Sequence, residues 1–196
     1  MSLIEKNIKE FWKLFIIIFA LNFNSNAKAD ETAFYLGLSQ PLLFKGYNVE
    51  VNYKTDHWVF EYSHGWDLKL HEFKDAMTDD EAKQNLKITL PYTTGGGVGY
   101  RVTKEFHVAL EYKIHQFNVD SPIDNSFSYT TQTLGVGVYY DWRPFKNSGF
   151  SVMPALRYWP TIATTLKGNK KIFTNGEIHE SHKFDIAPNV KIGWAF

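Results

Sequence analysis

Large apolar residues alternate with polar or small residues along most of the chain. Between Phe106 and His115, every even position is large and apolar, and every odd position is polar or small. A period of two is typical of a β-strand, whose successive side chains point to opposite faces, and it differs from helical spacing. The pattern predicts eight strands, at about 33–40, 46–54, 58–69, 86–102, 105–118, 127–143, 149–164 and 182–196.

The connections between these strands alternate between short and long. The short ones are 55–57, 102–104 and 144–148, and the long ones are about 41–45, 70–85, 119–126 and 165–181. Short turns on one rim and longer loops on the other are typical of bacterial outer-membrane barrels, and most of the strands reach the roughly 9–11 residues that a tilted spanning strand needs. An even number of strands puts both termini of the chain on the turn side, as this arrangement requires. The predicted fold is all-β: an eight-stranded antiparallel up-and-down transmembrane β-barrel.

The first 29 residues follow a different pattern. Lysines precede an apolar core at Leu14–Leu21, and Ala27-Lys28-Ala29 matches the A-x-A pattern of a cleavage site. The apolar core is far shorter than the ~20 residues of a membrane-spanning helix. We therefore expect a secretory signal peptide at 1–29, cut before Asp30, and a barrel domain at 30–196. The alternative is an amphipathic helix kept on the mature protein.

Composition narrows the class further. Basic and acidic residues balance at 21 each, which argues against a nucleic-acid partner, because phosphate contacts need a basic face. The chain has 16 Phe, 11 Tyr and 6 Trp, which argues against disorder. It has no cysteine, which excludes disulfides, thiolate metal sites and a lipid-attached cysteine.

At this level the chain resembles the small eight-stranded outer-membrane barrels of the OmpA/OmpX type. The resemblance rests on the alternation, the loop asymmetry and the last strand, where Val190, Ile192, Trp194 and Phe196 share one face. In that family such a terminal aromatic strand is a signal for the barrel-assembly machinery, so the resemblance implies this role for Trp194 and Phe196 and this machinery as a partner. Lys191 stands where the family often has glycine.

The two faces of the strands can be assigned to the inside and the outside. A soluble lipocalin would turn the apolar face inward around a ligand. Here the other face carries glycines, among them Gly95, Gly97 and Gly137. Glycines weaken an outer face without benefit, whereas in a narrow lumen they make room for long charged side chains. Aromatic residues of the apolar face gather toward both strand ends, as expected for two membrane interfaces. We therefore expect the apolar face to meet lipid.

This orientation gives a list of lumen residues. The expected charge network comprises Glu50, Glu61, Asp67, Arg101, Glu111, Lys113, Asp141, Arg143, Arg157, Asp185 and Lys191, with Lys54 and Lys69 beside it. The interior of an eight-stranded barrel is just wide enough for side chains to fill, and buried charges persist only when paired. The first interpretation is a salt-bridged plug that closes the barrel. The alternative is a narrow channel for ions or for small or hydrophobic solutes.

One residue departs from the alternation. Counting in steps of two from Trp58 brings His64 to the lipid face, where an unsatisfied polar group is costly. Either a bulge at Gly65 shifts the phase, or His64 has a function. Lipid A deacylases of the outer membrane have a lipid-facing His and Ser, which makes a lipid A-modifying enzyme a further alternative.

Other motifs support no catalytic residue, metal site or cofactor. The run Gly95–Gly99 lacks the Lys and the helix of a phosphate-binding loop, and His179–His182 has the wrong spacing for a zinc-protease motif. Thr78 to Glu81 predicts a capping box that opens a short helix.

The predicted loops differ in charge. The loop 70–85 is acidic, whereas Lys167, Lys170, Lys171 and Lys183 make the loop before the last strand basic. One interpretation is that the two loops are solvated or pair with each other. The alternative is that the basic loop binds phosphates of surface lipopolysaccharide, or that both loops form an adhesive surface. We expect an outer-membrane protein of structural or surface-interaction role, with lipid and lipopolysaccharide around it and a surface partner that the sequence does not specify.

Overall fold

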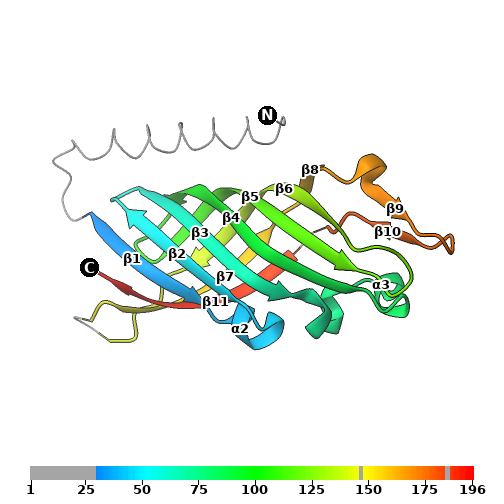
Figure 1. Cartoon of the computed structure of the whole chain (residues 1–196). Helices are drawn as coiled ribbons and strands as arrows, with labels where there is room; N and C mark the ends of the chain where they lie inside the picture. The colour runs from blue at the N-terminus through cyan, green and yellow to red at the C-terminus, as the bar shows by residue number, and fades with distance from the viewer. Residues whose placement is uncertain (1–29, 146–147, 184–185) are drawn as a thin grey trace.

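The computed structural model describes residues 30–145, 148–183 and 186–196. Figure 1 shows a tilted ring of long strands, with both ends of the described chain at one rim and β8, β9, β10 and α3 at the other. The predicted signal peptide at 1–29 lies outside the described residues. Within them, no helix is both long and apolar enough to cross a membrane.

The strands close into an antiparallel barrel. Seven of the eight positions are single strands: β1 (Glu31–Gly37), β2 (Tyr47–Lys54), β3 (Trp58–Lys69), β4 (Lys87–Arg101), β5 (Phe106–Asp120), β6 (Phe127–Tyr140) and β11 (Ile186–Ala195). The other position is shared by β7 (Phe150–Tyr158) and β8 (Thr161–Thr164), which both pair with β6 and are separated by Trp159 and Pro160. The first strand pairs with the last, which closes the ring. The predicted eight-stranded up-and-down barrel is confirmed.

The long connections carry the remaining structure. They hold α2 (Ser39–Phe44), η1 (Leu70–Glu72), η2 (Lys74–Ala76), α3 (Asp79–Lys83), η3 (Lys167–Asn169), β9 (Lys170–Ile172) and β10 (Ile178–Glu180). The predicted capping box is confirmed: the Glu81 N–H donates to the Thr78 hydroxyl, and the Thr78 N–H donates to the Glu81 carboxylate. The first predicted strand was too long, because β1 ends at Gly37 and the chain turns into α2.

Exposure alternates along the barrel wall with the predicted phase. In β6, odd positions from Tyr129 to Tyr139 are buried, whereas even positions from Leu134 to Tyr140 are exposed. The exposed positions on the wall are mainly large and apolar, as with Leu110, Val136 and Leu156, each about half exposed. The buried face of most strands carries the polar residues. The barrel is therefore apolar outside and polar inside over most of its length.

The phase reverses near the loop rim. Asp67 has a left-handed backbone, with φ of 54°, and the register of β4 against β5 shifts between Thr89 and Tyr92. Beyond these points, β3 and β4 turn apolar side chains inward. Together with inward apolar side chains of β5 and β6, whose phase is unbroken, they form a cap over the barrel end. The cap consists of Leu68, Leu70, Leu86, Ile88, Leu90, Phe117, Val119, Tyr129 and Phe173.

Candidate functional site: the charged interior and the loop contact

Three carboxylates and two lysines lie at the centre of the barrel. The Lys113 Nζ atom is 3.1 Å from Glu61 Oε1 and 3.7 Å from Glu111 Oε2, and it donates to Ser63 Oγ at 2.6 Å. The Lys191 Nζ atom is 2.5 Å from Glu50 Oε2. All five charged side chains are buried. At low dielectric a charge is tolerated only with such direct partners, so these ion pairs fix the side chains across the lumen.

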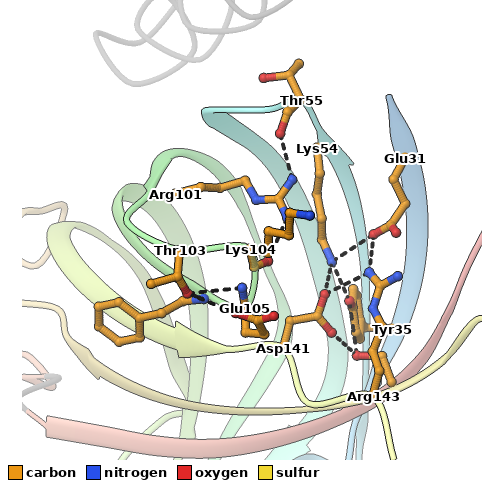
Figure 2. A network of polar contacts seen from close by, with 12 residues as sticks. Glu31, Tyr35, Lys54, Thr55, Arg101, Thr103, Lys104, Glu105, Asp141 and Arg143 are labelled. Carbon is orange, nitrogen blue, oxygen red and sulfur yellow. Dashed lines mark hydrogen bonds and ion pairs between the residues drawn. The ribbon is translucent and has the colours of Figure 1, made fainter. Parts of the chain in front are cut away.

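A second cluster lies at the turn rim and is shown in Figure 2. The Lys54 Nζ atom is 2.6 Å from Asp141 Oδ2 and 3.3 Å from Glu31 Oε1, and it donates to the Tyr35 hydroxyl at 2.8 Å. Arg143 reaches both carboxylates, at 3.0 Å from Asp141 Oδ2 and at shorter range from Glu31. The cluster ties the first strand to the segment after β6.

Arg157 belongs to the interior but differs from the lysines. Its side chain is buried and stacks on Trp159, with Cζ 4.2 Å from the ring centroid. Within the described part of the chain, no carboxylate lies within ion-pair distance of it, and its Nε atom has no hydrogen-bond partner. The guanidinium is therefore held by its stacking on the indole ring.

Glycines give the charged side chains their space. A Cβ atom at Gly97 would lie 2.9 Å from Glu111 Cγ and 3.1 Å from Glu61 Cγ. A Cβ atom at Gly137 would lie 2.6 Å from the Tyr139 ring, whose hydroxyl donates to Glu111. Two glycines on separate strands of the wall thus leave the volume that the carboxylates occupy.

Several predicted lumen residues lie elsewhere. Asp67 is exposed, because its left-handed backbone turns the side chain out of the lumen phase. Arg101 lies at the turn rim and donates to the backbone carbonyls of Thr55 and Lys104, at 2.7 and 2.6 Å, instead of pairing with a lumen carboxylate. Arg143 also lies at the rim, with a side chain 35% exposed. Asp185 lies outside the described residues, and Lys69 is half-buried at the end of β3.

Sequence reasoning missed the uncharged members of the interior. Tyr35, Ser63 and Tyr139 all donate to or accept from the charged groups. Their inward phase was visible in the sequence. Their polar roles were not, because Tyr fits equally well on an aromatic outer face.

His64 lies on the outward face of β3. The register runs without a break through Gly65 on both sides of the strand, so the proposed bulge at Gly65 is wrong. The imidazole is half-buried and stacks on Trp66 with 6.0 Å between ring centroids. Thr94 is its cross-strand neighbour on β4. The polar group thus lies beside an aromatic ring of the loop-side half of the wall.

The two charged loops meet through a buried pair of side chains and through Gln84, whose side-chain amide donates to the Ile178 carbonyl at 3.2 Å. The Glu81 carboxylate lies 3.2 Å from His179 Nδ1, and both side chains are almost fully buried. The other imidazole nitrogen lies 3.1 Å from the Tyr129 hydroxyl. Burial disfavours the charged form of Glu81, but His179, the Thr78 N–H and His182 outweigh burial and hold the pKa of Glu81 below its ordinary value of 4.5. The capping box therefore also positions the acid that contacts the second loop.

The lysines of the basic loop remain largely outside this contact. Lys167 and Lys170 are exposed, and Lys183 forms a solvent-exposed ion pair with Glu180. No group of three or more His, Asp or Glu side chains with metal-site geometry occurs among the described residues.

Solved outer-membrane barrels are similar to this chain. No protein-family model and no curated protein matches its sequence. The structure of Ail, the attachment invasion locus protein of Yersinia pestis, has a TM-score of 0.48 at 13% identity, covering 86% of this chain and 100% of that one. The N-terminal barrel domain of OprF from Pseudomonas aeruginosa has 0.42 at 12%, covering 85% and 96%. A major outer membrane protein of Thermus thermophilus has 0.42 at 10%, covering 86% and 100%.

Proposed function

We propose that the protein is an integral outer-membrane barrel, closed inside by ion pairs, that serves as a stable carrier of surface loops. The observation that carries the proposal is the inverted distribution of polarity: buried lysines and carboxylates face the lumen, while large apolar side chains stay exposed on the wall. A soluble monomer rarely exposes such a continuous apolar surface. Lipid tails can cover this wall, and pairing of the first strand with the last leaves the ring of strands without a free edge strand.

Aromatic side chains on the wall support the same placement. Trp58, Tyr100, Trp142 and Trp194 are each about half exposed near the turn rim, and Trp66, Tyr92 and Tyr158 are exposed nearer the loops. Aromatic girdles of this kind flank the apolar band of membrane barrels. We also propose that Trp194 and Phe196, exposed at the end of the last strand, present the signal read by the barrel-assembly machinery.

Protease treatment of intact cells tests the topology. Trypsin should cut at exposed lysines of the loops, such as Lys74 and Lys170, and spare Lys104 in a short turn. Cleavage at Lys104 instead would reverse the orientation. The mass of the purified protein tests the signal peptide, because removal of residues 1–29 leaves Asp30 at the N-terminus.

Conductance tests whether the lumen is closed. The paired lysines and carboxylates cross the interior between β3, β5, β2 and β11. In planar bilayers we expect no steady single-channel steps from the wild-type protein. Regular steps would support the alternative, a narrow channel for small solutes.

We propose no catalytic role. The geometry around His64 offers a stacked indole and a threonine as neighbours, while Ser63 is buried on the opposite face and bound by Lys113. Lipid A extracted from cells that express the protein should keep its acyl chains. Loss of an acyl chain that depends on His64 would establish the enzyme hypothesis.

Three lysines of the basic loop suggest the surface ligand: Lys167 and Lys170 are exposed, and Lys171 is half-buried. We propose that Lys167, Lys170 and Lys171 bind phosphate groups of lipopolysaccharide, since ammonium groups attract phosphate without requiring a shaped pocket. Replacing the three by Gln should weaken binding of lipopolysaccharide, while replacing the exposed Lys104 at the other rim should not. Equal binding of lipopolysaccharide by the two variants would show that the three lysines of the basic loop do not bind it.

A further inference from the structure

A cavity lies between the charged centre of the barrel and its apolar cap. Its volume is about 520 Å³, within the range of pockets that bind small molecules. On the turn side its lining includes Ser63, Lys113, His115, Arg157 and Trp159. On the loop side the lining includes Phe44, Leu68, Leu70, Phe73, Met77 and Leu90. The interior is thus filled at the level of the ion pairs and hollow above them.

The charged end of this cavity carries donors that have no partner. Arg157 lines the cavity, is buried, and has an Nε atom without an acceptor in the described residues. The Nε1 atom of Trp159, which also lines the cavity, is likewise buried without a partner among them. Buried donors are normally satisfied, so two unpaired donors on stacked side chains indicate a position for an acceptor.

The nearby carboxylates do not serve Arg157. Glu50, Glu61 and Glu111 each keep one buried oxygen without a hydrogen-bond partner, but among the described residues none of them lies within ion-pair distance of the guanidinium. Glu61 and Glu111 contact Lys113, and Glu50 contacts Lys191. The other charged residues of the lining, Asp75 and Lys183, belong to the exposed loops. We therefore expect an anionic group of a ligand as the acceptor for Arg157 and Trp159. The guanidinium would bind it directly, and the positive charge of the neighbouring Lys113 would attract it.

The cavity extends to a discontinuity in the wall. The strand β1 ends at Gly37, opposite Lys191, and the Leu38 N–H still donates to the Val190 carbonyl. From Asn189 back to Ile186, β11 is paired only with β7. The helix α2 follows β1 directly, and Gln40, Leu43, Phe44, Ile186 and Pro188 all line the cavity. Leu43 and Ile186 are also solvent-exposed. An apolar chain could thus pass between α2 and β11 without crossing the charged centre.

We propose that this cavity binds a single-chain amphipathic anion, with its head on Arg157 and Trp159 and its tail under the apolar cap. A carboxylate and a phosphate monoester share the required chemistry. The proposal concerns the barrel itself, so it does not depend on whether the ion pairs below block conduction.

Binding of labelled decanoate to the full mature chain in phosphatidylcholine nanodiscs tests the proposal, with empty nanodiscs as the blank. Wild-type protein should show saturable binding, displaced by unlabelled decanoate. Decyl phosphate should also compete if the site binds any anionic head group. It should not compete if the site binds only carboxylates. Decanol and decyltrimethylammonium should compete poorly, because neither brings an anion to Arg157.

Matched variants locate the site. Arg157→Gln should weaken binding about tenfold or more, as expected for a lost charge-assisted hydrogen bond, while Arg143→Gln at the rim should change it by less than about twofold. Met77→Trp, in the loop after η2, should fill the apolar end and weaken binding without touching a strand, which keeps the test valid if Arg157→Gln fails to fold. Absence of saturable binding, equal effects of Arg157→Gln and Arg143→Gln, or equal competition by decyltrimethylammonium would overturn the proposal.

Discussion

Lys191 on the last strand and Glu50 on the second lie 2.5 Å apart, although β1 lies between their strands. Both side chains are buried, and the Lys191 ammonium also lies 4.6 Å from the centroid of the Tyr139 ring. The pair therefore links β11 to β2 across β1, next to the place where the first and last strands close the barrel.

Removing one partner of this pair should be costly. Lys191→Met leaves Glu50 buried without its counter-ion and should lower the free energy of unfolding by about 3–5 kcal/mol. The double variant Lys191→Met/Glu50→Leu should recover most of that loss, because no uncompensated charge remains. Urea unfolding in lipid vesicles measures both. Lys183→Met is the control: its pair with Glu180 is solvent-exposed, so it should lose at most about 1 kcal/mol. Equal losses for Lys191→Met and Lys183→Met would contradict the structure.

Within the rim cluster, Asp141 should contribute more than Arg143 to the stability of the barrel. Asp141→Asn removes the carboxylate 2.6 Å from buried Lys54 and should cost about 3 kcal/mol. Arg143→Gln removes a side chain that is partly in water and should cost about 1 kcal/mol or less. The same unfolding measurement ranks the two. If Arg143→Gln were the more damaging change, Arg143 rather than Lys54 would hold the cluster together.

Arg101 should order the turn that follows β4. Arg101→Gln removes its guanidinium from the carbonyls of Thr55 and Lys104 and should speed amide hydrogen exchange at 102–105 by about a hundredfold, since the two bonds contribute about 1.5 kcal/mol each. Lys104→Gln keeps the carbonyl and should leave exchange unchanged. Faster exchange in both variants would show that side-chain charge, not the hydrogen bonds, orders this turn.

Acid should release the contact between the two loops. The pKa of Glu81 is lowered in the folded protein, so its contribution to stability is present above the ordinary value of 4.5 and is lost as the pH falls through the lowered pKa. Hydrogen exchange around α3 and β10 should therefore accelerate as the pH drops below 4.5, after correction for the intrinsic exchange rate. Glu81→Gln should show fast exchange at neutral pH and little further change in acid, while exposed Glu177→Gln should behave as wild type. A wild-type loop that stays protected in strong acid would contradict this role of Glu81.

Strand positions were readable from the sequence because alternation repeats in every strand. The predicted range 58–69 matches β3, and the predicted range 149–164 matches β7 and β8 together. The hairpin of β9 and β10 was missed, because three-residue strands are too short to show a period. Glu61 and Lys113, on strand segments whose phase is unbroken, are buried as their parity indicated.

The sequence by itself determined the barrel, its two faces and the supply of charge to its interior, because each of these follows from residue type and parity within one strand. Tertiary structure alone decided which charges meet. The left-handed residue Asp67 reverses the phase of β3, and a register shift between Thr89 and Tyr92 does so in β4, so that both strands add apolar side chains to the cap. Packing places Arg157 on Trp159, while the lysines pair with the carboxylates. Pairing across a lumen depends on stagger, bulges and side-chain reach between strands distant in sequence, and no local pattern encodes these.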